Sequence, residues 1–139
     1  MGDVLVERQE LVVDHFGRWP EFHDAVMYEL AFRLSEEREV VDMKLRHAEM
    51  TPELDARGYY KLVKHCNVHL RFHGVTDIEI EGHAPVTTLF DLVLRPCPNP
   101  EQGSESGMAV EWSASYGMQG TFWCKRAEVV SLVPTEPQP

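Results

Sequence analysis

Apolar and polar residues alternate along most of the chain with a period of two, which is typical of half-buried β-strands. The first alternating run covers residues 26–34, and its apolar positions are Val26, Tyr28, Leu30, Phe32 and Leu34. Later runs cover residues 41–45, 62–72, 75–82, 88–95, 108–116 and 120–133. Turn residues separate these short runs, so the pattern predicts a meandering, curled antiparallel sheet of about six to seven strands.

The N-terminal residues follow a different pattern. Apolar residues between Val4 and Phe16 fall partly at helical spacing, Asp3 can cap the first turn, and Gly17 can end the helix. One short N-terminal helix beside the sheet gives an α+β, mainly β, fold class.

The segments between these runs are expected to be turns or loops. They are the turns at 35–38 and at His73-Gly74, the loops at 51–60 and 96–107, and a flexible Pro-rich tail at 134–139. Residues 1–133 are therefore expected to form a single domain.

The charge of the chain limits its partners. The 139 residues include 13 basic and 23 acidic side chains, which gives a net charge of −10. Such a field repels nucleic acid and anionic lipid, and no basic patch is visible in the sequence. No signal-peptide pattern or membrane-spanning apolar run is visible either. These features indicate a cytoplasmic protein without a nucleic-acid or membrane partner, and an acidic surface suits either a basic protein partner or simply solubility.

The motifs of several enzyme and metal-binding classes are missing from the sequence. Cys66, Cys97 and Cys124 are odd in number and lack a Cys-x-x-Cys pair, so buried or unreactive thiols are favoured over disulfides or a zinc knuckle. No βαβ unit, phosphate-binding glycine loop or Gly-x-Ser-x-Gly elbow is visible. No cofactor is therefore expected.

Three histidines spaced by four residues raise the possibility of a metal site. On a helix, His65, His69 and His73 would form one stripe, and the first two could share a zinc ion. On a strand, four residues span about 13 Å, which is too far for two imidazoles to reach one ion at roughly 2 Å each. The alternation of residues 62–72 favours the strand, and the helical alternative stays open through Leu62, Cys66 and Leu70.

Asp77, Glu79 and Glu81 alternate with Ile78 and Ile80, which places the three carboxylates about 7 Å apart along one strand face. Carboxylates act as a catalytic acid pair only when burial raises one pKa, and this face is expected to be solvated. We therefore favour a solvated strand face without a specific function. A contact surface for a basic partner is the second interpretation, and a catalytic site is the third.

A tryptophan near the C-terminus is a candidate contact residue. Alternation places Phe122 and Cys124 on one face of their strand and Trp123 on the other, beside Thr121 and Lys125. If Phe122 lies in the core, the indole lies on the polar face. Tryptophan is enriched among residues that dominate binding energy, so Trp123 joins the carboxylates as a candidate partner-binding residue, unless a curled sheet buries both faces.

The stretch RWPEFHDA at 18–25 lies between the expected helix and the first strand. Pro20 restricts Trp19 to an extended conformation, and Trp19 and Phe22 are placed to fill the junction. Asp24 can accept backbone hydrogen bonds in a turn. Adjacent side chains on an extended segment diverge, so we favour a structural corner over a reactive His23–Asp24 pair.

The chain resembles a family of bacterial immunity proteins, immunity protein 50 and its relatives. The resemblance is carried by FGRWPEFHDAVMYELAF, in which Trp19, Pro20, Phe22, His23 and Asp24 match the most specific part of the motif. FHGVTDIEIEG and ASYGMQGTFWCKRAEV resemble the central and C-terminal patterns of the same family. The resemblance implies a non-enzymatic protein with a β-rich body that binds and neutralises a cognate polymorphic toxin of interbacterial competition.

Two alternatives from other classes stay open. The first is a small metal-dependent enzyme that uses His23 and Asp24 with His65 and His69. The second is a generic intracellular protein-binding domain. No oligomeric state follows from the sequence.

Overall fold

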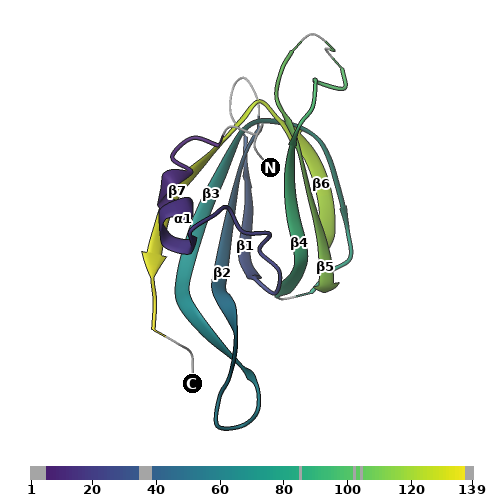
Figure 1. Cartoon of the computed structure of the whole chain (residues 1–139). Helices are drawn as coiled ribbons and strands as arrows, with labels where there is room; N and C mark the ends of the chain where they lie inside the picture. Colours follow the sequence, from purple (N-terminus) through teal and green to yellow (C-terminus); the bar gives the residue numbers. More distant parts are fainter. Residues whose placement is uncertain (1–5, 35–38, 85, 102, 104, 137–139) are drawn as a thin grey trace.

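The fold is built from seven strands and one short helix. A computed structural model of the chain describes residues 6–34, 39–84, 86–101, 103 and 105–136. Its elements, in chain order, are α1 (Glu10–Phe16), β1 (Val26–Arg33), β2 (Glu39–Leu54), β3 (Tyr60–Glu81), β4 (Thr87–Pro96), β5 (Met108–Tyr116), β6 (Gln119–Cys124) and β7 (Arg126–Pro134) (Figure 1). The α+β, mainly β, class predicted from the sequence is confirmed.

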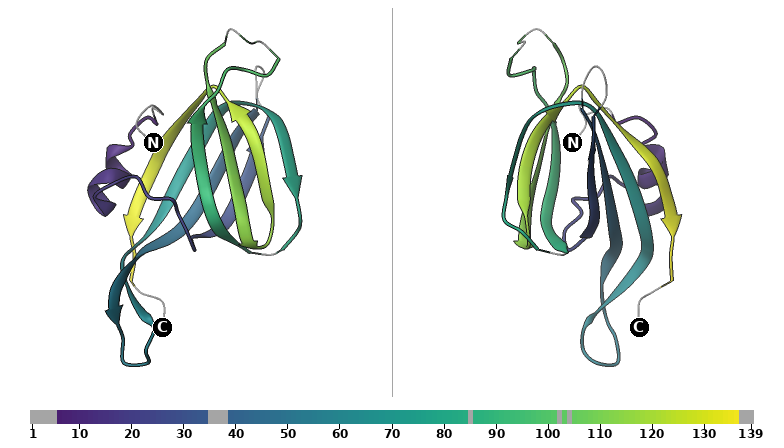
Figure 2. Two further views of the ribbon diagram at one scale, coloured as in Figure 1. Left: turned by 45° about the vertical axis from the view of Figure 1, so that its right-hand side comes forward. Right: turned by 180° about the vertical axis from the view of Figure 1, so that it is seen from behind.

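The sheet closes on itself. Its strand order is β2-β1-β4-β5-β6-β3-β7, and β2 also pairs with β3, so six strands form a ring and β7 lies beside β3 outside it. The join between β1 and β4 is short and consists of the pairs Val26–Thr88 and Met27–Thr87. Figure 2 shows the two halves of the sheet facing one another. Closure of this kind removes most of the exposed strand edges of an open sheet.

The longest strand, β3, connects the two halves of the ring. Its residues up to Val75 pair with β2 or β7, and residues from Thr76 to Glu81 pair with β6. The backbone is left-handed at Gly74 (φ 69°) and at Asp77 (φ 57°), and a bulge lies between Thr76 and Glu79. The turn expected at His73-Gly74 is therefore wrong. The strand bends there without leaving the sheet, because a bulge absorbs one extra residue and increases the local twist.

The core confirms the alternation predicted for β2 and β3. Its most deeply buried residues there, each no more than 1 % exposed, are Val41, Met43, Leu45, Cys66, Val68, Leu70 and Phe72. In β1 the predicted phase is wrong at the start of the strand, where Met27 is buried and Tyr28 is 41 % exposed, and it is confirmed at Leu30, which packs against the core. A bulge between Met27 and Glu29 shifts the register of β1 against β2, and one extra residue exchanges the two faces of a strand.

The helix is shorter than predicted. It begins after Gln9 and ends at Gly17, whose left-handed conformation (φ 84°) confirms the predicted end. Ahead of the helix, Glu7 forms a parallel bridge to Glu128 of β7. The backbone of Glu7 finds hydrogen-bond partners at the free edge of β7, and a helix that included Glu7 would lose these hydrogen bonds. The predicted cap Asp3 and the predicted turn at 35–38 lie outside the described residues.

Half of the loop expected at 51–60 is strand. β2 and β3 run past the ring as a hairpin, which projects below the barrel in Figure 1, and Asp55–Tyr59 connect the two strands. The amides of Arg57 and Tyr59 donate to Asp55 Oδ1 and close this turn. Within the described ranges, the helix content consists of the seven residues of α1, and no helix there could cross a bilayer.

Candidate functional site: an acidic hollow on the outer sheet face

A shallow hollow of about 490 Å³ lies on the outer face of the sheet, where the end of β3 meets β6, β5 and β4. We call it the acidic hollow. Its carboxylates are Glu79, Glu81, Asp91 and Glu111, and its neutral polar side chains are Ser113, Gln119 and Thr121.

Strand register arranges these side chains in two rows. Glu79, Thr121 and Glu111 are partners across β3, β6 and β5 in the first row. In the second row Gln119 pairs with Glu81, and Ser113 pairs with Asp91. Neighbouring strands lie about 4.8 Å apart, so the backbones of Glu79 and Glu111 are separated by about 10 Å. The carboxylates thus surround neutral hydroxyl and amide groups.

Only part of this acidic charge is neutralised. Arg95 Nη2 lies 2.7 Å from Glu111 Oε1 and balances that charge, whereas Asp91 Oδ1 accepts a hydrogen bond at 2.6 Å from the uncharged Ser113 Oγ. Glu79 and Glu81 are exposed, and no ion pair to either of them is present within the described part of the chain. The hollow therefore keeps a net negative charge.

The floor of the hollow is held by a tryptophan packed on a glycine. Trp112 is buried and pairs with Gly120 across β5 and β6, and its Nε1 donates to the carbonyl of Met118 at 3.1 Å. A Cβ atom at Gly120 would come within 2.8 Å of the indole ring and 2.9 Å of the Glu79 carbonyl oxygen. Close packing of this kind fixes the positions of the strands that carry the carboxylates.

Sequence reasoning found Glu79 and Glu81 but missed Asp91 and Glu111. Both missed residues occupy outward positions of alternating strands, as do Glu79 and Glu81. The alternation could have indicated that they face outward. Only the register of β4, β5 and β6 shows that all four carboxylates meet at one place.

The prediction that Asp77 shares a row with Glu79 and Glu81 is wrong. Asp77 lies in the bulge of β3, with a left-handed backbone, and its Oδ2 accepts a hydrogen bond from Thr76 Oγ1 at 2.9 Å. The bulge breaks the two-residue period on which the predicted row depends. Asp77 therefore does not line the acidic hollow.

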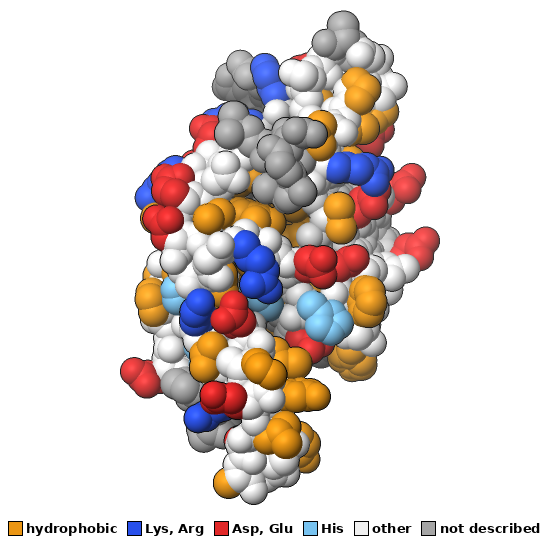
Figure 3. Space-filling model, in the orientation of Figure 1, with side chains coloured by type: hydrophobic (Ala, Val, Ile, Leu, Met, Phe, Trp, Pro, Cys, Tyr) orange, Lys and Arg blue, Asp and Glu red, His pale blue; other side chains and the backbone are white. Residues whose placement is uncertain are grey.

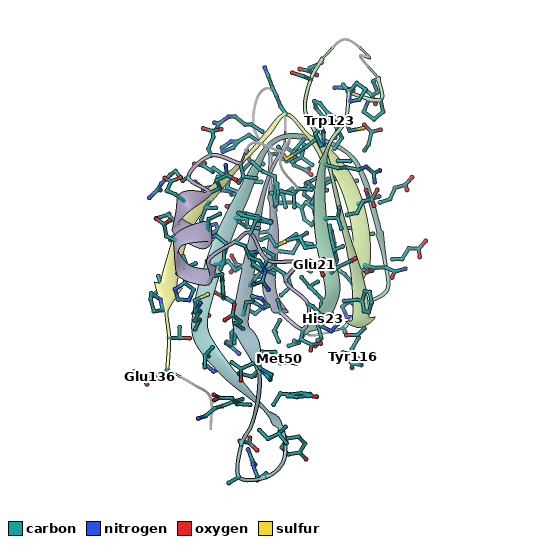
Figure 4. All side chains as sticks on the ribbon, viewed as in Figure 1. Glu21, His23, Met50, Tyr116, Trp123 and Glu136 are labelled. Atoms are coloured by element: carbon teal, nitrogen blue, oxygen red, sulfur yellow. The ribbon has the colours of Figure 1, made fainter. Side chains whose placement is uncertain are left out.

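The prediction that Trp123 is exposed is also wrong. Phe122 and Cys124 lie in the core as predicted, and Trp123 points to the other face, but its side chain is only 2 % exposed. Its Nε1 donates to the carbonyl of Cys97 at 2.9 Å, and Gly107 packs so closely that a Cβ atom there would collide with the indole. Trp123 is an anchor for the segment between β4 and β5, which covers it (Figure 4).

That covering segment, residues 96–107, was expected to be a flexible surface loop. Cys97 N donates to the carbonyl of Gly107 at 3.1 Å, and Asn99 N donates to that of Glu105 at 2.9 Å. The buried Asn99 side chain donates to Glu105 Oε1 and accepts from the amide of Glu101. The described residues of this segment are therefore held in place by hydrogen bonds, which a buried amide needs. The composition of a loop does not reveal such hydrogen bonds.

The corner at 18–25 has the packing expected of a structural element. Pro20 and Phe22 are buried, and Trp19 packs edge-to-face on Phe22 with ring centroids 5.8 Å apart. Asp24 N donates to the carbonyl of Leu89, and Leu89 N donates to that of Ala25. These contacts tie the corner to β4.

The expectation that the His23 and Asp24 side chains diverge is wrong. His23 Nε2 lies 3.6 Å from Asp24 Oδ2, because Phe22 (φ 59°) and Asp24 (φ 66°) are left-handed and the segment is not extended. His23 Nδ1 also donates to the carbonyl of Phe90 at 2.8 Å. Both side chains of the pair are more than half exposed, at 54 % and 55 %.

The left-handed backbone at Asp24 leads to a prediction. Asp24→Val should lower the free energy of unfolding by about 1 to 3 kcal/mol, because a β-branched residue is strained at positive φ, whereas Asp24→Gly should change it by less than about 1 kcal/mol. Urea unfolding of both variants measures the difference. Equal losses in the two variants would show that the carboxylate itself, and not the backbone conformation, stabilises the corner.

The three histidines of β3 lie on a strand, as predicted, and two of them have separate carboxylate partners. His69 Nε2 donates to Asp42 Oδ1, and His73 Nε2 donates to Glu128 Oε1, each at 2.7 Å. No group of three or more His, Cys, Asp or Glu side chains in the described ranges is arranged to hold a metal ion. His23 and Asp24, at the corner beside Phe90, are not part of these contacts.

Asp42 is the centre of an ion-pair network that sequence reasoning missed. Its nearly buried carboxylate lies 2.7 Å from Arg33, 2.7 Å from His69 and 2.8 Å from Arg71. Burial raises the pKa of Asp42, but hydrogen bonds from His69 and Arg71 and the charges of Arg71 and Arg33 together hold the pKa below its ordinary value. This network lies on the opposite half of the sheet from the acidic hollow, on β1, β2 and β3.

The described cysteines are all free thiols. Burial raises the pKa of Cys66 to about 11 and that of Cys124 to about 12. Both therefore stay protonated near neutral pH, which suits buried core residues and not nucleophiles.

Comparisons of the chain with protein-family models, with curated protein sequences and with solved structures find no match.

Proposed function

We propose that the protein is a non-catalytic immunity protein that binds and neutralises a basic toxin domain of interbacterial competition. The acidic hollow is the observation that carries this proposal, because it offers a shaped, negatively charged surface on a closed sheet. The toxin as partner rests on the resemblance of the Trp19–Asp24 motif to immunity proteins.

Charge supports a basic partner. The chain carries a net charge of −10, and Glu79 and Glu81 stand unneutralised at one side of the hollow. Complementary charge speeds the encounter of two proteins and favours one orientation. Lysine or arginine side chains of a partner could reach the surrounding carboxylates while its neutral groups form hydrogen bonds with Ser113, Gln119 and Thr121.

The rigidity of the floor supports binding without rearrangement. The polar side chains of the hollow project from four paired strands, three of which carry the carboxylates, and Trp112 packs on Gly120 beneath them. A preorganised surface loses little conformational entropy when it binds, so more of the interaction energy contributes to affinity.

The test is the binding kinetics of the protein with any toxin domain that a gene beside its own encodes. Reversing two charges of the hollow, Glu79→Lys with Glu81→Lys, should slow association about 10- to 100-fold at low ionic strength and weaken its salt dependence. The dissociation rate should change much less, because exposed charges mainly steer the encounter.

A matched control reverses two exposed charges on α1, Glu10→Lys with Asp14→Lys. This helix packs against β7 and β3, across the barrel from β5 and β6 (Figure 1). Both variants change the net charge equally, so a difference between them reports the location of the charges. If the two pairs slow association equally, the hollow is not the binding surface. If the protein neither binds a neighbouring toxin nor protects cells that produce one, the immunity function is wrong.

A further inference from the structure

The strand β1 has one edge that the ring leaves largely open. On one side β1 pairs with β2 along its length, whereas on the other side only Val26 and Met27 pair with β4. β1 and β4 separate beyond this short join (Figure 1, Figure 2), and Figure 3 shows hydrophobic side chains at the surface between the two halves of the sheet. From Tyr28 onwards, β1 therefore has a free edge within the described part of the chain.

The hydrogen bonds of β3 show which backbone groups of β1 point to this edge. Thr135 N donates to the carbonyl of His65, and Lys125 N donates to that of His73, so odd-numbered residues of β3 bond on the β7 side. Successive residues of an antiparallel strand bond to opposite sides. Even-numbered residues of β3 therefore bond to odd-numbered residues of β2, and even-numbered residues of β2 bond to odd-numbered residues of β1.

Leu30 and Phe32 thus direct their backbone N–H and C=O groups to the free edge. In the described ranges these groups have no strand partner and no turn or loop partner. Both side chains point to the core side of the sheet, because they lie opposite Met43 and Val41 of β2. Phe32 is nevertheless 41 % exposed, and Leu34, just past the strand, is 88 % exposed. A core-facing phenylalanine is exposed here because no strand covers the edge.

The unpaired backbone groups identify what can cover this edge. Another strand presents donors and acceptors at the same spacing, whereas a purely apolar contact would bury the N–H and C=O groups without partners. We propose that the free edge of β1 pairs antiparallel with β1 of a second copy, about a two-fold axis at Ala31. A two-fold axis uses the same surface of both copies, so the strand has to be complementary to itself.

The backbone of β1 meets this requirement about Ala31. Leu30 lies opposite Phe32 of the second copy, and Phe32 lies opposite Leu30, so their free groups form about four hydrogen bonds across the axis. Ala31 lies opposite its own copy in a non-hydrogen-bonded pair, where Cα atoms are only about 4.5 Å apart and a small side chain fits. The ladder and the exposed Phe32 ring are covered together.

The side chains of β1 are complementary in the same register. Glu29 lies opposite Arg33 of the second copy, and Tyr28 lies opposite Leu34. Both charged side chains lie on the outer face, where ion pairs to β2 hold them. An axis at Leu30 or at residue 32 would keep the ladder but would leave Glu29 and Arg33 without opposite charges. Residues 26–33 carry one acidic and one basic side chain, so this strand is neutral in a chain of charge −10.

Sedimentation of the full chain from about 1 to about 100 μM, in about 0.15 M salt, tests the dimer. The parent protein should change from the mass of one 16.0 kDa chain to that of two. Phe32→Pro should weaken the dimer at least about 10-fold, because proline removes an N–H that points to the free edge and not to β2. Phe32→Val is the matched control, since it also removes the ring but keeps the N–H, and it should dimerise more tightly than Phe32→Pro.

Hydrogen exchange tests the ladder without any variant. The amides of Leu30 and Phe32 should exchange at least about 10-fold more slowly at the high concentration than at the low one. The amides of Ala31 and Arg33 bond to β2, so they should exchange slowly at both concentrations. Equal exchange of Leu30 and Phe32 at the two concentrations contradicts the proposed pairing.

A cysteine at the axis tests the register. Ala31→Cys should form a disulfide-linked dimer in oxidised glutathione, because Cα atoms about 4.5 Å apart lie within the range of a disulfide. Glu29→Cys lies about 13 Å from its own copy in this register and should form no such dimer beyond that of the parent protein. A parent protein that stays monomeric overturns the proposal, even if a toxin domain then protects Leu30 and Phe32 from exchange. Equal association of the two Phe32 variants, or equal cross-linking of the two cysteine variants, also overturns it.

Discussion

Trp123→Ala is expected to lower the free energy of unfolding by about 3 to 5 kcal/mol, the usual cost of removing a buried aromatic side chain. The indole is only 2 % exposed, and it supports the covering segment between β4 and β5. Its removal leaves a cavity under that segment and an unpaired carbonyl at Cys97. Urea unfolding of the variant and the parent measures the loss.

Trp123→Phe separates the two contributions. This variant keeps most of the aromatic contacts and loses the hydrogen bond to Cys97, so it should lose less stability than Trp123→Ala, about 1 to 3 kcal/mol. Gly107→Ala should also destabilise the protein, because its new Cβ atom would collide with the indole. A Trp123→Ala variant as stable as the parent, but defective in partner binding, would show that the indole is a contact residue after all.

Acidification from pH 7 to about pH 4 is expected to destabilise the protein through His47, by up to about 3 kcal/mol. The pKa of His47 is lowered to about 4, chiefly by burial; the charge of His23 also lowers this pKa, whereas the charges of Asp24 and Glu49 raise it. The ring packs between Phe16 and Phe22, with centroids 5.3 and 5.1 Å away. In the unfolded chain the histidine titrates near its ordinary pKa of 6.5.

The direction of the effect follows from proton binding. Between pH 6.5 and 4 the unfolded chain binds a proton at His47 that the folded protein does not, so stability falls as the pH is lowered through this window. The carboxylates Asp42 and Glu128 have lowered pKa values, so their contribution to stability is lost as the pH falls below their ordinary pKa values of 3.8 and 4.5, at the acidic end of this window and beyond it. The window therefore reports chiefly on the histidine.

The comparison variant is His47→Leu, which has no group that titrates. Its free energy of unfolding should be nearly constant between pH 7 and about pH 4.5, whereas that of the parent should fall. Urea unfolding at several pH values gives both curves. Parallel curves would mean that His47 is not the group that confers the pH dependence.

The sequence by itself determined several features of this protein. Alternation identified β2 and β3 and the side of each that forms the core, because the two-residue period of a strand is a local property. Gly17 marked the end of the helix, because its left-handed conformation is open to glycine at little cost. The apolar residues of RWPEFHDA also indicated a packed corner, and Pro20 and Phe22 are buried there.

Three further features were decided by the tertiary structure. Bulges in β1 and β3 reversed the exposure of Tyr28 and removed Asp77 from its row, since a bulge depends on the partner strand. A segment about 20 residues away in sequence covered Trp123. The acidic hollow gathered carboxylates from three strands, β3, β4 and β5. Alternation states which way a side chain points from its own strand, whereas register, bulges and covering segments depend on contacts between distant residues, which a local pattern does not contain.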